Sequence, residues 1–383
     1  MRNNTPPLEQ LIGKTSKRVR SSNLELYRII CMLMIVAHHY VVNSGLDEGP
    51  ILENSMAANS IYLALFGAWG KVGINCFMLI TGYFMCSSRI TFRKILKLLL
   101  QVYLYRIIIY PIFLIAGYES FSLMRIVKLV MPVWDFQSNF TSCFIIFYLT
   151  IPFLTILIQN LNKRQHELLI LLALVCYTLL GSVPKFEISF NYITWFGILF
   201  FVASYIRLYP NPIFSKRKVW GLLTLGCVAA AFASIVFMSW LYGDKGSRLV
   251  YFFVVDSNKI IAFSFAVCSF LWFKNLNIRY SKIINAFGAG TFGVLLIHAQ
   301  SDAMRKWLWK DVVDCVGNYT LPLGSLVLYS IGAVFAIFVI CNLIDQLRIN
   351  TLEKWFFKWY DKRVSSKIDT FVDKHVIGKQ TNA

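Results

Sequence analysis

Long runs of apolar residues recur along this chain and restrict the folds that are open to it. Ten such segments lie at about 24–43, 71–87, 95–117, 140–161, 166–183, 190–209, 219–242, 258–274, 284–301 and 321–345. A helix rises about 1.5 Å per residue, so roughly 20 residues cross a hydrocarbon layer of about 30 Å. Hydrophobic residues make up 57% of the chain and charged residues 15%, whereas charged residues make up about 25% of soluble domains. We therefore expect an all-α integral membrane protein with about ten transmembrane helices.

The distribution of basic residues predicts the orientation of the chain. With a cytoplasmic N-terminus, 27 of the 38 Lys and Arg residues fall on the cytoplasmic side, ten fall in outer loops, and Arg106 lies inside the third segment. Positively charged loops stay in the cytoplasm, so both termini are expected there and the protein is expected in the inner (cytoplasmic) membrane. The same distribution explains the net charge of +19 without a nucleic-acid partner. No small-residue cleavage site follows a short apolar core near the start, so no cleaved signal peptide is expected.

Three parts are expected: a basic N-terminal segment over 1–22, a membrane domain over 23–346 and a basic tail over 347–383. Between Asn350 and His375 the tail mixes aromatic residues with Lys and Arg. This pattern is typical of an amphipathic helix that lies on an anionic membrane surface. A partly ordered basic tail is the alternative.

The nine cysteines do not indicate a metal site. None forms a Cys-x-x-Cys pair, and eight lie within or at the ends of apolar segments. Buried cysteines of this kind act as small apolar side chains. We expect no bound metal.

Ionisable residues inside the first apolar segment are the first candidates for function. Removing such a side chain from water costs a few kcal/mol unless another group compensates. Arg28 and His39 are eleven residues apart, which is close to three turns, so both leave one helix face about 16 Å apart along the axis. His38 points about 100° away from His39 and is expected to face a neighbouring helix or a backbone carbonyl, with a direct role as the alternative. Arg106 likewise needs a partner or a water-filled cavity.

Four stretches, the first of which contains Arg28 and His39, follow one another along the chain. Residues 23–40 read NLELYRIICMLMIVAHHY and place Arg28 ten intervening residues before His39; residues 73–85 read GINCFMLITGYFM; residues 89–101 read RITFRKILKLLLQ; and residues 290–299 read GTFGVLLIHA, with His298 near the end. Together these stretches resemble the acyltransferase 3 family of bacterial membrane acyltransferases, many of which acetylate surface polysaccharides. The third stretch departs from the Arg-x-x-Arg of many members, because Lys94 and Lys97 are the closest pair by spacing.

The resemblance implies an O-acyltransferase and points to His39 as its general base. Attack of a sugar hydroxyl on a thioester needs a base near neutral pH, and a histidine has an unperturbed pKa of about 6.5. The implied donor substrate is acetyl-CoA or another acyl-CoA, with no permanently bound cofactor. The implied acceptor is a hydroxyl of a cell-surface polysaccharide or of its lipid-linked precursor.

The remaining site residues follow from the same resemblance. Cations at the cytoplasmic end are expected to bind the acyl donor, namely Arg28, Arg89, Arg93, Lys94 and Lys97, although anchoring to anionic headgroups is the alternative for the cluster. Possible acceptor or supporting residues are His38, Asn75, Tyr83 and His298. For Asn75 and Tyr83 the alternative is an interhelical hydrogen bond, and for His298 it is an ordinary interfacial histidine.

Two other functions stay open at this point. A transporter or flippase of polyprenyl-linked saccharides would also need many spans and buried polar groups. Transfer of a larger acyl group such as succinyl, or transfer to an amine, is compatible with the family. The sequence leaves the oligomeric state open.

Overall fold

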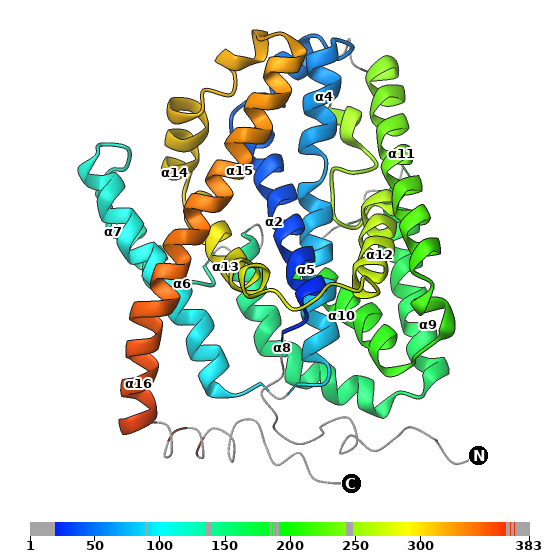
Figure 1. Ribbon diagram of the computed structural model, residues 1–383, viewed down its shortest axis with the longest axis vertical. Coiled ribbons are helices and arrows are strands. Elements are labelled where there is room, and N and C mark those ends of the chain that lie inside the picture. The colour runs from blue at the N-terminus through cyan, green and yellow to red at the C-terminus, as the bar shows by residue number, and fades with distance from the viewer. Residues whose placement is uncertain are drawn as a thin grey trace.

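Helices make up most of the described chain. The computed structural model describes residues 20–88, 90–134, 139–183, 186, 188, 191–242, 248–364, 368 and 371, and no strand occurs among them. The α-helices, shown in Figure 1, are α2 (Ser22–Val42), α3 (Pro50–Glu53), α4 (Ala58–Gly67), α5 (Gly70–Met85), α6 (Phe92–Ile115), α7 (Leu123–Val130), α8 (Phe140–Asn160), α9 (Lys163–Leu174), α10 (Tyr192–Leu208), α11 (Arg217–Tyr242), α12 (Ile260–Lys274), α13 (Lys282–His298), α14 (Asp302–Lys306), α15 (Leu323–Arg348) and α16 (Lys354–Arg363). The predicted all-α class is confirmed.

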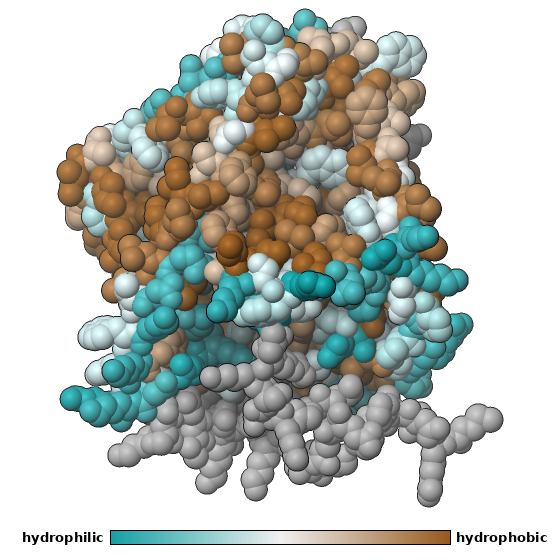
Figure 2. Space-filling model, viewed as in Figure 1, coloured by the Kyte–Doolittle hydropathy of each residue, from teal (hydrophilic) through white to brown (hydrophobic). Residues whose placement is uncertain are grey.

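Among the described residues, seven helical spans are long and apolar enough to cross a membrane, and an eighth is added if the bent pair α13 and α14 is one span. Two more helices are apolar but shorter, α10 with 17 residues and α12 with 15. Each of the ten predicted segments coincides with one of these helices, while the number of crossings and the side of the termini stay predictions. In Figure 2 an apolar belt covers most of the visible face, and hydrophilic side chains gather below it.

Two spans are longer than the sequence pattern predicts. The second begins at Ala58, because α4 stacks on α5 to give 28 residues up to Met85. The last runs for 41 residues from Leu323 to Arg363, because α15 continues through a π-helical turn at Ile349–Glu353 into α16. The predicted boundary at 347 therefore lies inside one continuous helix. Most of the N-terminal segment and of the tail beyond 364 lies outside the described residues.

Helix α2 lies at the centre of the bundle and packs against α4, α5, α12, α13 and α15 (Figure 1). The helices approach one another closely where a glycine lies at the contact, as is common between membrane helices. A Cβ on Gly70 of α5 would lie 2.2 Å from Cγ of His38. A Cβ on Gly293 of α13 would lie 2.1 Å from Cγ of Asp345 on α15. Gly70 therefore gives the ring of His38 its space against α5.

Candidate active site

A cavity of about 270 Å³ lies beside the last turn of α2, and we call it the histidine cavity. Both His38 and His39 line it, together with residues of α5, α6, α10, the start of α8 and the segment after α13. Helix α13 ends at His298, and the chain turns by 96° into the next helical stretch. Ala299 and Gln300, in this turn, line the cavity. Irregular backbone at membrane depth is tolerated where it lines such a cavity.

His39 is one end of a hydrogen-bonded chain of two histidines. Nδ1 of His298 lies 2.6 Å from the carbonyl oxygen of Val294, and Nε2 of His298 lies 2.8 Å from Nδ1 of His39. The carbonyl can only accept, so Nδ1 of a neutral His298 carries the proton and its Nε2 is an acceptor. His39 must then donate from Nδ1, which leaves a lone pair on its Nε2. This tautomer is assigned from the hydrogen bonds, and it makes His39 ready to take up a proton.

His38 is held from a different side. Its Nδ1 donates to the carbonyl oxygen of Gly67 at 2.6 Å, which ties α2 to the end of α4. Gly70 leaves the room that the ring occupies, as described above. The expected contact with a backbone carbonyl is thus present. The ring also lines the histidine cavity beside His39, with ring centroids 5.8 Å apart.

Three cations line the histidine cavity, and no Asp or Glu does so in the described part of the chain. Lys71 donates from Nζ to the hydroxyl of Tyr192 at 2.7 Å. Arg106 donates to the carbonyl of Lys128 at 3.1 Å, so both a partner and a cavity receive it. The third cation is Arg305. The cavity therefore favours anions and developing negative charge.

Of the predicted donor-binding cations, Arg93, Lys94 and Lys97 lie near the start of α6, where Arg93 and Lys97 have carboxylate partners. Arg93 pairs with Asp361 of α16. Lys97 lies 2.5 Å from Glu353, at the π-helical turn. Lys94 is on the same two turns of α6, and Arg89 lies outside the described residues. None of the described members of this cluster lines the histidine cavity.

A buried ladder of polar contacts connects this cluster with the cavity. Gln101 and Tyr105 follow Lys97 at steps of four residues, so they share one face of α6. Both donate to Oδ1 of Asp345, at 3.2 Å and 2.7 Å, and Arg348 bridges Asp345 to Glu353 at 2.7 Å and 2.6 Å. Tyr105, the last residue of the ladder, lines the histidine cavity.

Three other candidates are placed away from the cavity. The guanidinium of Arg28 lies 5.9 Å from the ring centroid of Phe77, and Arg28 does not line the histidine cavity. Asn75 is fully buried, donates to the carbonyl of Ser257 at 2.6 Å and accepts from the indole of Trp195 at 2.8 Å.

Tyr83 accepts a hydrogen bond from Arg207 at 3.0 Å, so it joins α5 to α10. Asn75 and Tyr83 thus make the interhelical contacts that the sequence left open for them.

Sequence reasoning did not single out Lys71, Tyr192 or Arg305. Lys71 begins an apolar segment, where lysine is common at a helix end, and Arg305 falls in a predicted outer loop. Only the turn after His298 brings Arg305 to the cavity. No local pattern carries that information, although Lys71 precedes the 73–85 stretch by two residues.

Comparison with known families agrees with the stretches that carry the resemblance. The family model for acyltransferase 3, described as an acyltransferase domain, matches residues 21–344. This range runs from the start of α2 into α15 and includes every residue that lines the histidine cavity. The comparisons with curated proteins and with solved structures gave no match. The match covers most of the chain, and the chain therefore belongs to the acyltransferase 3 family of membrane acyltransferases.

Proposed function

We propose that this membrane acyltransferase transfers acetyl from acetyl-CoA to a hydroxyl of a cell-surface polysaccharide or of its lipid-linked precursor, in the cytoplasmic membrane. The observation that carries the proposal is the histidine pair. His298 accepts from Nδ1 of His39 and leaves Nε2 of His39 as a proton acceptor beside a cavity lined by cations. A general base, room for a substrate and stabilisation of negative charge are the three needs of acyl transfer.

In the proposed reaction Nε2 of His39 removes the proton of the acceptor hydroxyl while its oxygen attacks the thioester carbonyl. A C–O bond forms, and the carbonyl oxygen becomes negatively charged. When the oxyanion collapses, the C–S bond breaks, and the imidazolium of His39 returns its proton to the sulfur of the leaving CoA. Nε2 of His298 accepts a hydrogen bond from the imidazolium throughout, which stabilises its positive charge.

Lys71 is the cation that we assign to the developing oxyanion. Its Nζ is fixed by the hydroxyl of Tyr192 at 2.7 Å and lines the cavity that holds His39. A cation that is already in place needs no reorganisation when charge develops in the transition state. Arg106 and Arg305 add to the positive potential of the same cavity.

The acyl donor is proposed to approach along α6. Its phosphates would be bound by Arg93, Lys94 and Lys97, with Arg28 near the same end of the bundle. From Lys97 to Tyr105 is eight residues, or about 12 Å along the helix. An extended pantetheine arm covers such a distance, so the thioester would reach the histidine cavity while the nucleotide stays at the end of α6.

The test compares two histidines in full-length protein reconstituted with labelled acetyl-CoA and surface glycan from the same cells. His39→Ala is expected to abolish acetyl transfer and to retain acetyl-CoA binding. His166→Ala is the matched control, because His166 on α9 is buried, bonds to the carbonyl of Phe201 at 3.0 Å and does not line the cavity. Acetylation that persists in His39→Ala would contradict the proposal.

Mass spectrometry of the surface glycan, with and without the protein, identifies the acyl group and the modified hydroxyl. If the glycan made without the protein lacks a succinyl group and not an acetyl group, the donor is a succinyl thioester and the mechanism stays the same. Movement of a lipid-linked saccharide across vesicles without any acyl transfer would instead favour a transporter.

A further inference from the structure

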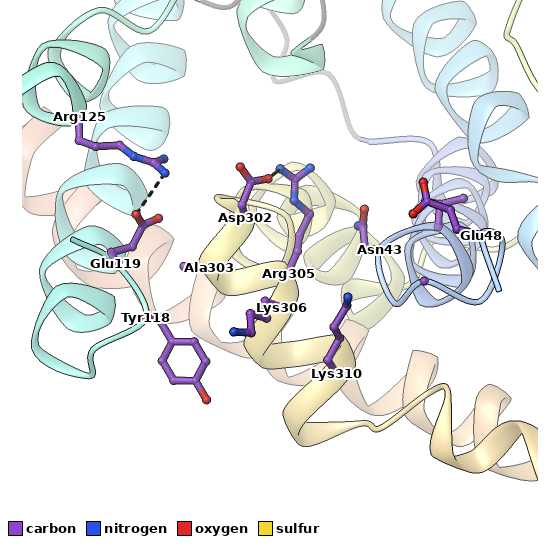
Figure 3. Close-up of a pocket in the computed structure, with 12 residues that line it drawn as sticks. Asn43, Glu48, Tyr118, Glu119, Arg125, Asp302, Ala303, Arg305, Lys306 and Lys310 are labelled. Atoms are coloured by element: carbon purple, nitrogen blue, oxygen red, sulfur yellow. Dashed lines mark hydrogen bonds and ion pairs between the residues drawn. The ribbon is translucent and has the colours of Figure 1, made fainter. Parts of the chain in front are cut away.

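A second, larger cavity adjoins the histidine cavity, and we call it the lysine cavity. Its volume is about 530 Å³, and it lies between the end of α2, the turn after α6, α7, and the stretch from α14 to Lys310 (Figure 3). Val42, Asn43 and Arg305 line both cavities. A ligand bound in the lysine cavity is therefore next to the cavity that contains His39.

Two of the four cations that line the lysine cavity form no ion pair with another described residue. Three acidic residues line this cavity: Glu48, Glu119, which pairs with Arg125 at 3.4 Å, and Asp302, which pairs with Arg305 (Figure 3). Lys306 and Lys310 are exposed and have no carboxylate partner in the described part of the chain.

Asp311, which follows Lys310 in the chain, contacts Tyr118. It accepts a hydrogen bond from the hydroxyl of Tyr118 at 2.8 Å, and this bond raises the pKa of Tyr118 above its usual value. No ion pair joins Asp311 to Lys306 or Lys310 among the described residues, so both lysines can bind an anion.

The position of these cations cannot be explained by the positive-inside bias. They lie beyond the end of α2, at the end of the bundle opposite the basic start of α6, where the bias predicts few basic residues. Five of the ten basic residues assigned to outer loops nevertheless line one of the two cavities: Lys71, Arg125, Arg305, Lys306 and Lys310. Half of the basic residues on the disfavoured side therefore line two adjoining cavities, one of which His39 also lines.

We propose that the acceptor carries an anionic group, a carboxylate or a phosphate, which Lys306 and Lys310 bind in the lysine cavity while a hydroxyl of the acceptor reaches His39. This inference rests on the proposed acyl transfer. Exposed ammonium groups attract an anion and steer it to the opening. The absence of carboxylates from the described lining of the histidine cavity removes repulsion further along the route. A neutral saccharide would gain nothing from either feature.

The test measures binding without any acyl donor. Full-length protein in phosphatidylcholine nanodiscs is titrated with trigalacturonate, which supplies carboxylates, with glucose 1-phosphate, which supplies a phosphate, and with neutral maltotriose. We expect at least one anionic probe to bind more tightly than maltotriose and to weaken as salt is added. The anionic probe that binds identifies the source of the charge. Binding of neither anionic probe, or equal binding of maltotriose, would overturn the proposal.

The variant Lys306→Gln/Lys310→Gln is expected to lose at least about tenfold in affinity for the anionic probe and none for acetyl-CoA. Lys218→Gln is the control, since Lys218 is an exposed lysine at the start of α11 that lines neither cavity. Unchanged affinity in the double variant would refute the assignment of the lysines.

His39→Ala separates this inference from the proposed function. It should bind the anionic probe as the wild type does, because His39 is not needed for that contact. An active transferase whose double variant still binds the probe would leave only this inference wrong. If the protein transfers no acyl group but binds the anionic probe through Lys306 and Lys310, the anion site is supported and the proposed function is wrong.

Discussion

Replacing His298 tests whether the second histidine acts through the first. His298→Asn places a carboxamide about where Nδ1 now lies, so it cannot reach Nδ1 of His39, which is 2.8 Å from Nε2. His298→Gln is one methylene longer, and its carbonyl oxygen falls near the present position of Nε2 and can accept. The two variants remove the same ring and differ in whether His39 keeps its acceptor.

The expected loss of rate follows from the charge that His39 gains. During transfer its imidazolium donates from Nδ1 to His298, and a hydrogen bond to a charged group contributes about 1.5–3 kcal/mol. Each 1.4 kcal/mol changes a rate by about tenfold, so His298→Asn should slow acetyl transfer by about 10- to 150-fold. His298→Gln should retain most of the activity, because the hydrogen bond is re-formed.

The assay is single-turnover transfer of labelled acetyl from acetyl-CoA by reconstituted protein. A chemical step measured in this way excludes slow product release as the cause. Donor affinity should be equal in both variants, since His298 lies away from the cations at the start of α6. Equal rates for the Asn and Gln variants, or a wild-type rate for the Asn variant, would refute the relay.

Two more substitutions test the packing around the site. Gly70→Ala puts a Cβ 2.2 Å from Cγ of His38 and should lower the free energy of unfolding by about 1–3 kcal/mol and reduce transfer, whereas Gly226→Ala meets no atom within 4 Å and should not. Asp345→Asn removes the fully buried carboxylate of the ladder and should destabilise the protein by about 3–5 kcal/mol, as measured by thermal unfolding in detergent. Arg93→Gln, in an ion pair with both side chains 46% exposed, should change stability by only about 0–1 kcal/mol. Equal effects of the two glycine substitutions would contradict the packing argument. Equal effects of the two substitutions in ion pairs would contradict the argument from burial.

The helices were predictable because lipid imposes one rule along the whole chain. A segment that crosses hydrocarbon must satisfy its own backbone, so apolar length predicts helix position. The pattern did not show that a helix can extend past its apolar segment, as at α4 with α5 and at α15, which continues through the polar residues 348–354 into α16. Glycines in the stretches that carry the resemblance have a packing role that the sequence did not reveal. Gly293, for example, gives Asp345 its space.

The site was only partly predictable, because hydropathy places residues along a helix and not across the bundle. The first segment pointed to His39, and the fourth stretch pointed to His298 separately. Their 2.8 Å contact depends on how α2 and α13 pack. Arg305 needed the bend of 96° after α13. Hydropathy gives no signal for such a turn, so Arg305 was expected in an outer loop.

The ladder along α6 suggests how a donor is admitted without opening the core. At its exposed end the Arg93–Asp361 pair has both side chains 46% exposed, and a pair of that kind contributes about 0–1 kcal/mol. A CoA phosphate with greater charge can therefore displace Asp361 from Arg93 at little cost. At its buried end Asp345 is fully enclosed and bonded to Tyr105, Gln101 and Arg348, and breaking that set costs several kcal/mol. Displacement should therefore stop before Asp345, so the wall of the histidine cavity stays in place while the nucleotide binds.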